Sequence, residues 1–147
     1  MANDAKRLRM LERQHRITMV GRREALAALA QANATVAKSA ALATRSRMLA
    51  RQYGSRLTQG AGLELTQNGA FAGSLARIAK DADQSEAMAA QACDQHAGVL
   101  ATNDQKLERL DERISAKRRD IQRAHQIRET TDATALARKL LRKPMID

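Results

Sequence analysis

Hydrophobic side chains recur at alternating intervals of three and four residues along the N-terminal third of the chain. This spacing follows one face of an α-helix, whereas a half-buried strand would alternate at every second residue. Asn3 or Asp4 is suited to cap the start of such a helix. Polar residues occupy stripe positions 12, 15, 22, 33 and 47, so the stripe is imperfect. The pattern predicts a helix over about 4–53, with a stripe at Leu8, Met19, Leu26, Leu29, Val36, Ala40, Ala43, Ala50 and Leu57.

The same spacing resumes at Phe71 and continues for most of the remaining sequence. Glu86, His96, Asn103 and Lys117 interrupt it without breaking the period. Proline cannot continue a helix interior, so Pro144 is expected to end the segment. A second helix is predicted over about 71–141, with a stripe at Phe71, Leu75, Ala79, Ala82, Ala89, Cys93, Leu100, Leu107, Leu110, Ile114, Ile121 and Ala124.

Between the two patterns lies the stretch "YGSRLTQGAGLELTQNGAF", which holds four of the chain's seven glycines. It predicts a glycine-rich loop over about 54–70, bounded by Tyr53 and Phe71, with the turn centred near residue 62. Two helices of this length bury their stripes most simply against each other. The expected fold is all-α, a single domain over 1–147. It is a long antiparallel two-helix coiled-coil hairpin, and beyond about residue 124 the second helix outruns its partner as a C-terminal helical overhang.

The composition favours long helices rather than a globular fold with a large core. The chain is 44% hydrophobic, much of it alanine, with 1% aromatic residues and no tryptophan. A globular core normally depends on large side chains for buried area. No apolar run is long enough for a transmembrane helix, and the N-terminus lacks a signal-peptide core. The single cysteine, Cys93, cannot form an internal disulfide. A cytoplasmic protein is therefore expected.

Candidate chemistry is sparse. His15, His96 and His125 are far apart, and none has another metal ligand one helical turn away on a plausible face. Cys93 lies on the stripe and is interpreted as a small buried hydrophobe. The glycines form neither a phosphate loop nor a dinucleotide fingerprint. We therefore expect no catalytic residue, no cofactor site, no metal site and no enzymatic activity.

The formal net charge of +10 favours acidic partners such as nucleic acid, an anionic membrane or an acidic protein. In an antiparallel hairpin the acidic residues of the second helix face basic residues of the first, among them Arg13, Arg22 and Lys38. Two basic clusters also converge, one at residues 6–13 and the other at residues 117–123. Nucleic acid is disfavoured because no aromatic residues are interleaved with these charges for stacking on bases.

Several segments resemble a known family. These are "KLERLDER" over 106–113, "RET…DATALAR" over 128–138 and "RKP" over 142–144. Together with Tyr53, Phe71 and Leu75 around the loop, they resemble the flagellar type III export stalk protein family (FliJ) and its YscO-like relatives in injectisomes. The chain departs from the family in its high alanine content and in Leu49, where a second tyrosine would be expected.

The resemblance implies a non-catalytic coiled-coil stalk that couples the export ATPase to the export gate and promotes protein export. It further implies a cytoplasmic protein, peripheral at the cytoplasmic face of the membrane-bound export apparatus, that also binds export chaperones. Carried over by position, the export-gate contacts would be Tyr53, Phe71, Leu75 and Ala79. From charge, the contacts with the ATPase hexamer would be Arg9, Arg13, Arg16, Arg118, Arg119 and Arg123.

Two other functions stay open at this point. One is a basic helical hairpin that binds nucleic acid, and the other is a generic helical adaptor or chaperone. The motifs do not decide between flagellar and injectisome membership, although "RKP" favours the flagellar system. The oligomeric state is also open, because a second copy of the chain could complete the imperfect stripe.

Overall fold

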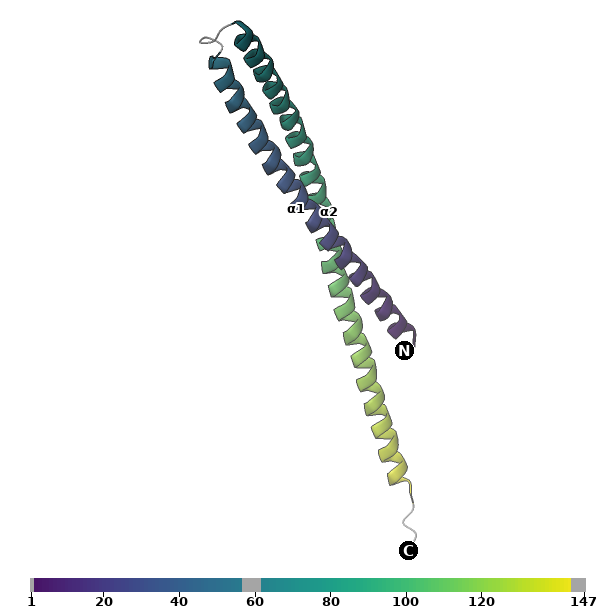
Figure 1. Cartoon of the computed structure of the whole chain (residues 1–147). Coiled ribbons are helices and arrows are strands. Elements are labelled where there is room, and N and C mark those ends of the chain that lie inside the picture. Colours follow the sequence, from purple (N-terminus) through teal and green to yellow (C-terminus); the bar gives the residue numbers. More distant parts are fainter. Residues whose placement is uncertain (1, 57–61, 144–147) are drawn as a thin grey trace. The chain divides into compact units, whose positions relative to one another are not determined.

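A computed structural model describes residues 2–56 and 62–143 of the chain. It consists of two long helices, α1 (Ala2–Ser55) and α2 (Gly62–Leu141), which pack against each other (Figure 1). The described residues contain no strand. The predicted all-α class is therefore confirmed. Leu57, Gly60 and Pro144, which the sequence assigned to the first stripe, the loop and the end of the second helix, lie outside the described residues.

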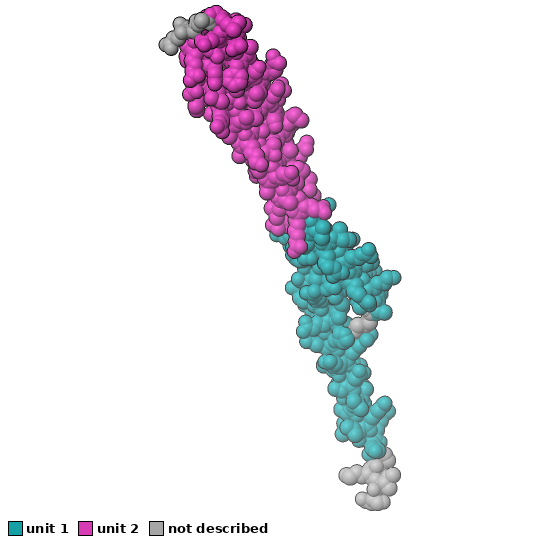
Figure 2. All heavy atoms as spheres, viewed as in Figure 1, with its two compact units in different colours: residues 1–21, 103–147 teal, residues 22–102 magenta. Residues whose placement is uncertain are grey.

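The contacts between the helices divide the chain into two compact units (Figure 2). Unit 1 combines Met1–Gly21 with Asn103–Asp147, and unit 2 is the continuous segment Arg22–Thr102. Each unit therefore contains a part of both helices. The aromatic residues fall in unit 2, whereas the two basic clusters at 6–13 and 117–123 fall in unit 1.

The helix starts differ from those expected. α1 begins at Ala2, so that Asp4 lies inside the first turn and is not its cap. A carboxylate in the first turn is favourable because it faces the positive end of the helix dipole. α1 also continues two residues past Tyr53, to Ser55, whose hydroxyl donates to the Gln52 carbonyl at 2.8 Å.

The larger correction concerns α2, which begins at Gly62 and not near residue 71. The segment "GLELTQNGA" is thus helical and was wrongly assigned to the loop. Within it, the Thr66 hydroxyl donates to the Gly62 carbonyl at 3.0 Å, and Glu64 supplies a negative charge to the first turn. Gly69 costs only about 1 kcal/mol in a helix, which the neighbouring helix-forming leucines and glutamine offset.

The predicted stripe of α2 agrees closely with the side chains that α1 shields. Leu75, Ala79 and Ala82 are buried, as are Leu107, Leu110 and Ile114. The polar interruptions Glu86, His96, Asn103 and Lys117 are partly shielded, as their stripe positions predict. Phe71 is the exception, because its side chain is 47% exposed.

The predicted stripe of α1 agrees with the shielded side chains at most positions, including Leu8, Met19 and Ala40, but not at three positions between residues 26 and 47. Leu29, Val36, Ala43 and Ala50 are shielded as expected, but Leu26 is 39% exposed. Asn33 and Arg47 are likewise exposed. The shielded positions between these are the preceding residues, all of them small: Ala25, Ala32, Ser39 and Ser46. Small side chains occupy these positions because they let the two helix backbones approach closely.

Contacts between α1 and α2 run in opposite directions along the two helices. In unit 2 the contacting pairs are Asn33 with Cys93, Ser39 with Ser85, Arg47 with Asp83, and Tyr53 with Phe71. In unit 1 they include Asp4 with Lys117 and His15 with Asp111. Tyr53 and Phe71 are equally distant in sequence from residue 62, and so are Ser39 and Ser85. This order agrees with the expected antiparallel register.

The C-terminal part of α2 has no shielding partner. Every described residue from 125 to 143 is exposed, including Ile127, Leu136, Leu140 and Leu141. Its last turn carries Arg138 and Lys139, whose charges suit the negative end of the helix dipole. Over the residues that the structure describes, neither helix has a stretch long and apolar enough to cross a membrane.

Candidate functional site

Two candidate interaction surfaces emerge, one in each unit. The surface in unit 2 is the aromatic pair, formed by Tyr53 near the end of α1 and Phe71 in α2. Their ring centroids lie 4.7 Å apart with an interplanar angle of 79°, an edge-to-face arrangement. The Arg56 guanidinium carbon lies 5.1 Å from the centre of the Tyr53 ring, within the range of a cation–π interaction.

The aromatic pair is only partly available to a partner. Tyr53 is half-buried, whereas Phe71 is exposed over nearly half of its surface. The other two gate-contact candidates, Leu75 and Ala79, are buried against α1. Their side chains can reach a partner only where the two helices separate. The four candidates thus divide into an aromatic pair at the surface and an aliphatic pair in the packed interior.

The second surface consists of basic side chains in unit 1. Arg9, Arg13 and Arg16 of α1 are exposed, and so are Arg119 and Arg123 of α2. Arg118 is also exposed, but its Nη2 lies 2.8 Å from Oε1 of Glu12, so this charge is paired within the unit. The Arg9 Nε donates to the Ala5 carbonyl of its own helix at 3.4 Å.

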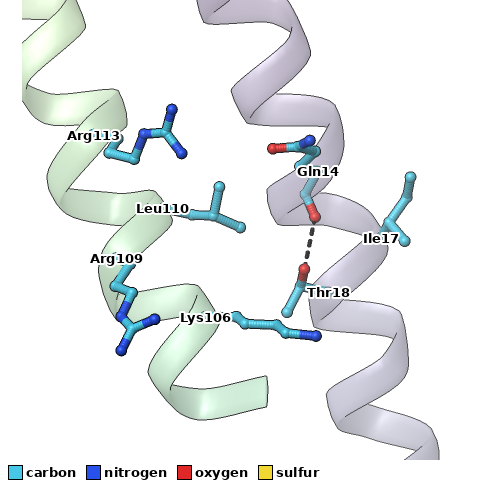
Figure 3. A pocket seen from close by; sticks show the side chains of 7 residues that line it. All are labelled: Gln14, Ile17, Thr18, Lys106, Arg109, Leu110 and Arg113. Atoms are coloured by element: carbon cyan, nitrogen blue, oxygen red, sulfur yellow. Dashed lines mark hydrogen bonds between the residues drawn. The ribbon is translucent and has the colours of Figure 1, made fainter. Parts of the chain in front are cut away.

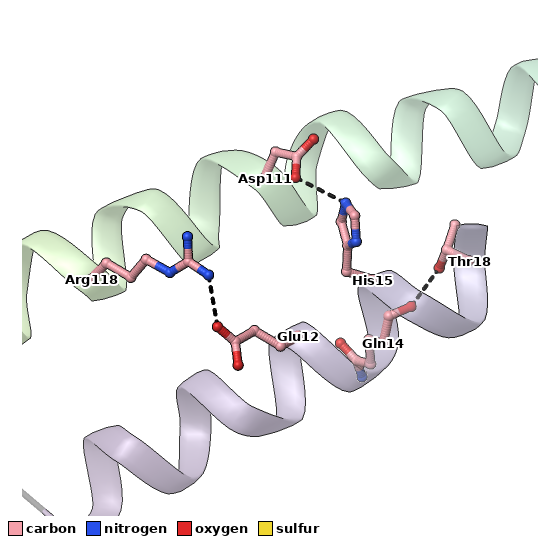
Figure 4. Close-up of polar contacts among 6 residues, drawn as sticks. All are labelled: Glu12, Gln14, His15, Thr18, Asp111 and Arg118. Atoms are coloured by element: carbon pink, nitrogen blue, oxygen red, sulfur yellow. Dashed lines mark hydrogen bonds and ion pairs between the residues drawn. The ribbon is translucent and has the colours of Figure 1, made fainter. Parts of the chain in front are cut away.

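Polar contacts join the two helices of unit 1 (Figure 4). His15 Nε2 lies 3.0 Å from Oδ1 of Asp111, next to the pair of Glu12 with Arg118. The expected partners of the acidic residues were arginines and Lys38. His15 pairs with Asp111 in unit 1 and Arg47 with Asp83 in unit 2, and neither residue was named among the expected partners. A stripe position alone did not reveal that His15 would meet a carboxylate, because this depends on the register between helices.

Asp4 and Lys117 form a further pair in unit 1, with Lys117 Nζ 2.7 Å from Oδ1 of Asp4. The hydrogen bond that Lys117 donates, together with its positive charge, holds the pKa of Asp4 below its ordinary value. Lys117 is a stripe residue whose side chain is only 20% exposed. Its aliphatic stem can therefore be shielded by α1 while its ammonium group reaches the carboxylate.

An open groove also lies in unit 1 (Figure 3). Leu110 points from α2 toward α1, while Lys106 and Arg113 flank it and Ile17 lies on the outer side of α1. An adjoining groove shares Gln14 and Arg113 and continues to Met10. Sequence reasoning missed this feature. The available signal was Met10 and Ile17, two apolar residues seven positions apart that the stripe leaves out.

Titratable groups elsewhere are scattered. No group of three or more histidine, cysteine or acidic residues within 2–56 and 62–143 could hold a metal ion. Cys93 is half-buried, and its thiol donates to Oδ1 of Asn33 at 3.1 Å. This contact gives Cys93 a packing role at the helix pair, where a small, weakly polar side chain fits.

Comparison of the chain with models of protein families, with curated protein sequences and with solved structures gave no match.

Proposed function

We propose that this protein is a non-catalytic coiled-coil stalk of a flagellar type III protein export apparatus. In this role it contacts the export ATPase ring and the export gate and promotes export. The observation that carries the proposal is the division of two surface types between the units. The aromatic pair belongs to unit 2, and the exposed arginines at positions 9–16 and 119–123 belong to unit 1.

The proposed architecture is one antiparallel hairpin in which α1 and α2 are joined by a short connection. The opposite order of contacts along the helices supports it. Ser39 Oγ and Ser85 Oγ lie 3.2 Å apart, so cysteines at these positions should form an intramolecular disulfide when Cys93 is replaced by alanine. Ser39→Cys with Ser74→Cys is the matched control, and equal crosslinking of both pairs would contradict the register.

A pull-down with the export ATPase and the gate protein from the same cell tests the function. We expect binding to both, and failure to bind either partner contradicts the proposal. Arg9→Glu, Arg13→Glu and Arg16→Glu together should weaken binding to the ATPase, because they reverse charges that lie exposed in unit 1. The control makes the same charge change on exposed arginines of unit 2: Arg45→Glu, Arg51→Glu and Arg77→Glu.

The gate contact is tested at the aromatic pair. Tyr53→Ala with Phe71→Ala should weaken gate binding and motility while leaving helicity nearly unchanged. Leu42→Ala with Met48→Ala is the control, because both side chains are exposed and apolar in the same unit. A large loss of thermal stability in the aromatic variant alone would instead identify the pair as a structural clasp.

The charge of the chain also supports a second candidate, a helical hairpin that binds nucleic acid. Contacts with phosphates release counterions, so such binding weakens steeply as salt increases. A mobility-shift titration of duplex DNA across salt concentrations separates the two functions. Tight, steeply salt-dependent binding at physiological salt would favour nucleic acid over the export role.

A further inference from the structure

We propose that the groove on unit 1 is a docking site for an acidic amphipathic helix of a partner protein. The groove is lined by the apolar side chains of Met10, Ile17 and Leu110 and by the basic side chains of Lys106, Arg109 and Arg113. The inference does not rest on the proposed export function, because a helical adaptor could use the same groove.

The apolar part of the groove is left uncovered by the packing of the two helices. Ile17 is 61% exposed and Met10 is 57% exposed, whereas Leu110 is buried in the seam between them and α2. Met10 and Ile17 are seven residues apart, so they lie two turns apart on nearly the same side of α1. A docked helix could place an apolar side chain against each of them, because its own residues repeat with that spacing.

The positive charges of three basic side chains in the groove are not neutralised by acidic residues that the structure describes. Lys106, Arg109 and Arg113 make no ion pair with any residue that the structure describes. The carboxylates of Glu12 and Asp111 are engaged elsewhere, with Arg118 and His15. Of the described residues that line the groove and its continuation, five are basic, one of which, Lys117, is paired with Asp4, and Asp120 alone is acidic.

The positive charges and the apolar side chains of the groove together indicate which kind of partner binds there. Lys106, Arg109 and Arg113 follow one another at three- and four-residue steps, so they present a row of cations along about two turns of α2. Acidic residues on one edge of a docked helix would match this row, while its apolar edge would cover Met10 and Ile17. Nucleic acid would neutralise the cations but leave the apolar side chains exposed. A second copy of the chain would bring another net charge of +10.

Fluorescence anisotropy with the full-length chain tests the proposal. The probe is a labelled synthetic peptide of about three heptads, with leucines along one edge and glutamates beside them. A peptide of the same composition in scrambled order is the control. We expect saturable binding of the amphipathic peptide only. Absence of binding, or equal binding of the scrambled peptide, would overturn the proposal.

Paired variants locate the contact. Arg109→Glu with Arg113→Glu should weaken peptide binding by about tenfold or more, whereas Arg138→Glu with Lys139→Glu makes the same charge change outside the groove. Ile17→Ser should also weaken binding, unlike Val20→Ser, which alters an exposed apolar residue of the same helix that does not line the groove. Circular dichroism should show unchanged helicity for all four variants. Equal losses from target and control variants would overturn the proposal.

Other occupants give distinct outcomes. Duplex DNA and anionic phospholipid vesicles are titrated with the same variants, and sedimentation measures self-association. Groove variants that abolish binding to DNA or vesicles while sparing the peptide would overturn the proposal. So would a concentration-dependent dimer that Ile17→Ser dissociates. Retained peptide binding in the presence of DNA and vesicles, together with loss in the groove variants, supports it.

Discussion

The two units pair the same two helices with different side chains. In unit 2, α1 contributes alanines and serines to the seam, including Ala32, Ser39 and Ala43. In unit 1, α2 contributes Leu107, Leu110 and Ile114, and two ion pairs and a contact between His15 and Asp111 cross between the helices. Small side chains bury little apolar area each but allow close backbone approach, whereas large ones bury more area at fewer positions.

This difference indicates how each unit obtains its stability. Unit 2 depends on the fit of small residues and on paired polar groups such as the hydroxyls of Ser39 and Ser85. Unit 1 depends on the hydrophobic burial of its larger side chains. Its polar contacts between the helices are partly exposed, so water and salt weaken them and they mainly favour one register. Unit 1 should therefore be destabilised most when a large seam side chain is truncated, and unit 2 when a small seam side chain is enlarged.

The largest effect is expected from truncation in unit 1. Leu107→Ala should lower the free energy of unfolding by about 2–3 kcal/mol, because it removes a buried side chain and leaves a cavity. Chemical denaturation measures the change. Leu136→Ala is the matched control, since Leu136 is exposed and its truncation should stay within about 0.5 kcal/mol. Similar losses from both variants would show that the seam of unit 1 is not the stabilising element.

Enlargement in unit 2 is expected to be the next most severe change. Ala43 is 1% exposed, so Ala43→Leu forces extra volume between the helices and should cost about 1–2 kcal/mol. Ala41→Leu makes the same change at an exposed position of α1 and should be nearly neutral. Thermal unfolding compares the two. If Ala43→Leu raised the melting temperature, the helices of unit 2 would have room for a larger seam.

A contrast between the two helices explains what the sequence could predict. The α2 seam was predicted nearly in full, because its apolar residues stand out against polar neighbours at helical spacing. The α1 seam was predicted less well, because Leu26, Asn33 and Arg47 on the predicted stripe are exposed; hydrophobicity ranks Leu26 above Ala25 and disfavours Ser39. Ser39 is nevertheless buried, since Ser85 satisfies its hydroxyl. A small seam residue is therefore hard to distinguish where a larger apolar residue adjoins it, as Leu26 adjoins Ala25, or where the seam residue is polar, as at Ser39.

Features that depend on register between the helices could not be predicted from spacing. The contact of His15 with Asp111 joins residues nearly a hundred positions apart. The unit 1 groove likewise combines Ile17 with Leu110 and Arg113. By contrast, Tyr53 and Phe71 were expected at the ends of the same loop, and their contact follows from an antiparallel pairing around residue 62. The early start of α2 was missed because glycine content outweighed the helix-forming residues.

Glycine-to-alanine substitutions inside the helices compare the packing of the two units and are expected to change stability less. A Cβ added at Gly21 in unit 1 would lie 3.5 Å from Nδ2 of Asn103, an ordinary contact, and one added at Gly98 in unit 2 meets nothing within 4 Å. Gly21→Ala and Gly98→Ala should each raise the free energy of unfolding by about 0.4–1 kcal/mol, because alanine loses less backbone entropy on folding. Denaturant titration measures both. A loss at Gly21 beside a gain at Gly98 would reveal tighter packing in unit 1.

The smallest effect concerns the pH dependence of unit 1. Lys117 lowers the pKa of Asp4 in the folded chain, so the carboxylate adds stability above the ordinary aspartate pKa of about 3.9. That stability is lost as pH falls through the lower folded value. Asp4→Asn should therefore be slightly less stable than the native chain near neutral pH, and the difference should shrink below about pH 4.

The test compares the thermal unfolding midpoints of Asp4→Asn and the native chain from about pH 6 down to about pH 3. Asp132→Asn is the control, because Asp132 lies on the exposed C-terminal part of α2 while Asp4 is held against Lys117. A pH-independent difference between Asp4→Asn and the native chain would contradict a role for the ionised carboxylate. The effect of Asp4→Asn would then come from a difference between the two side chains that does not depend on the charge of the carboxylate.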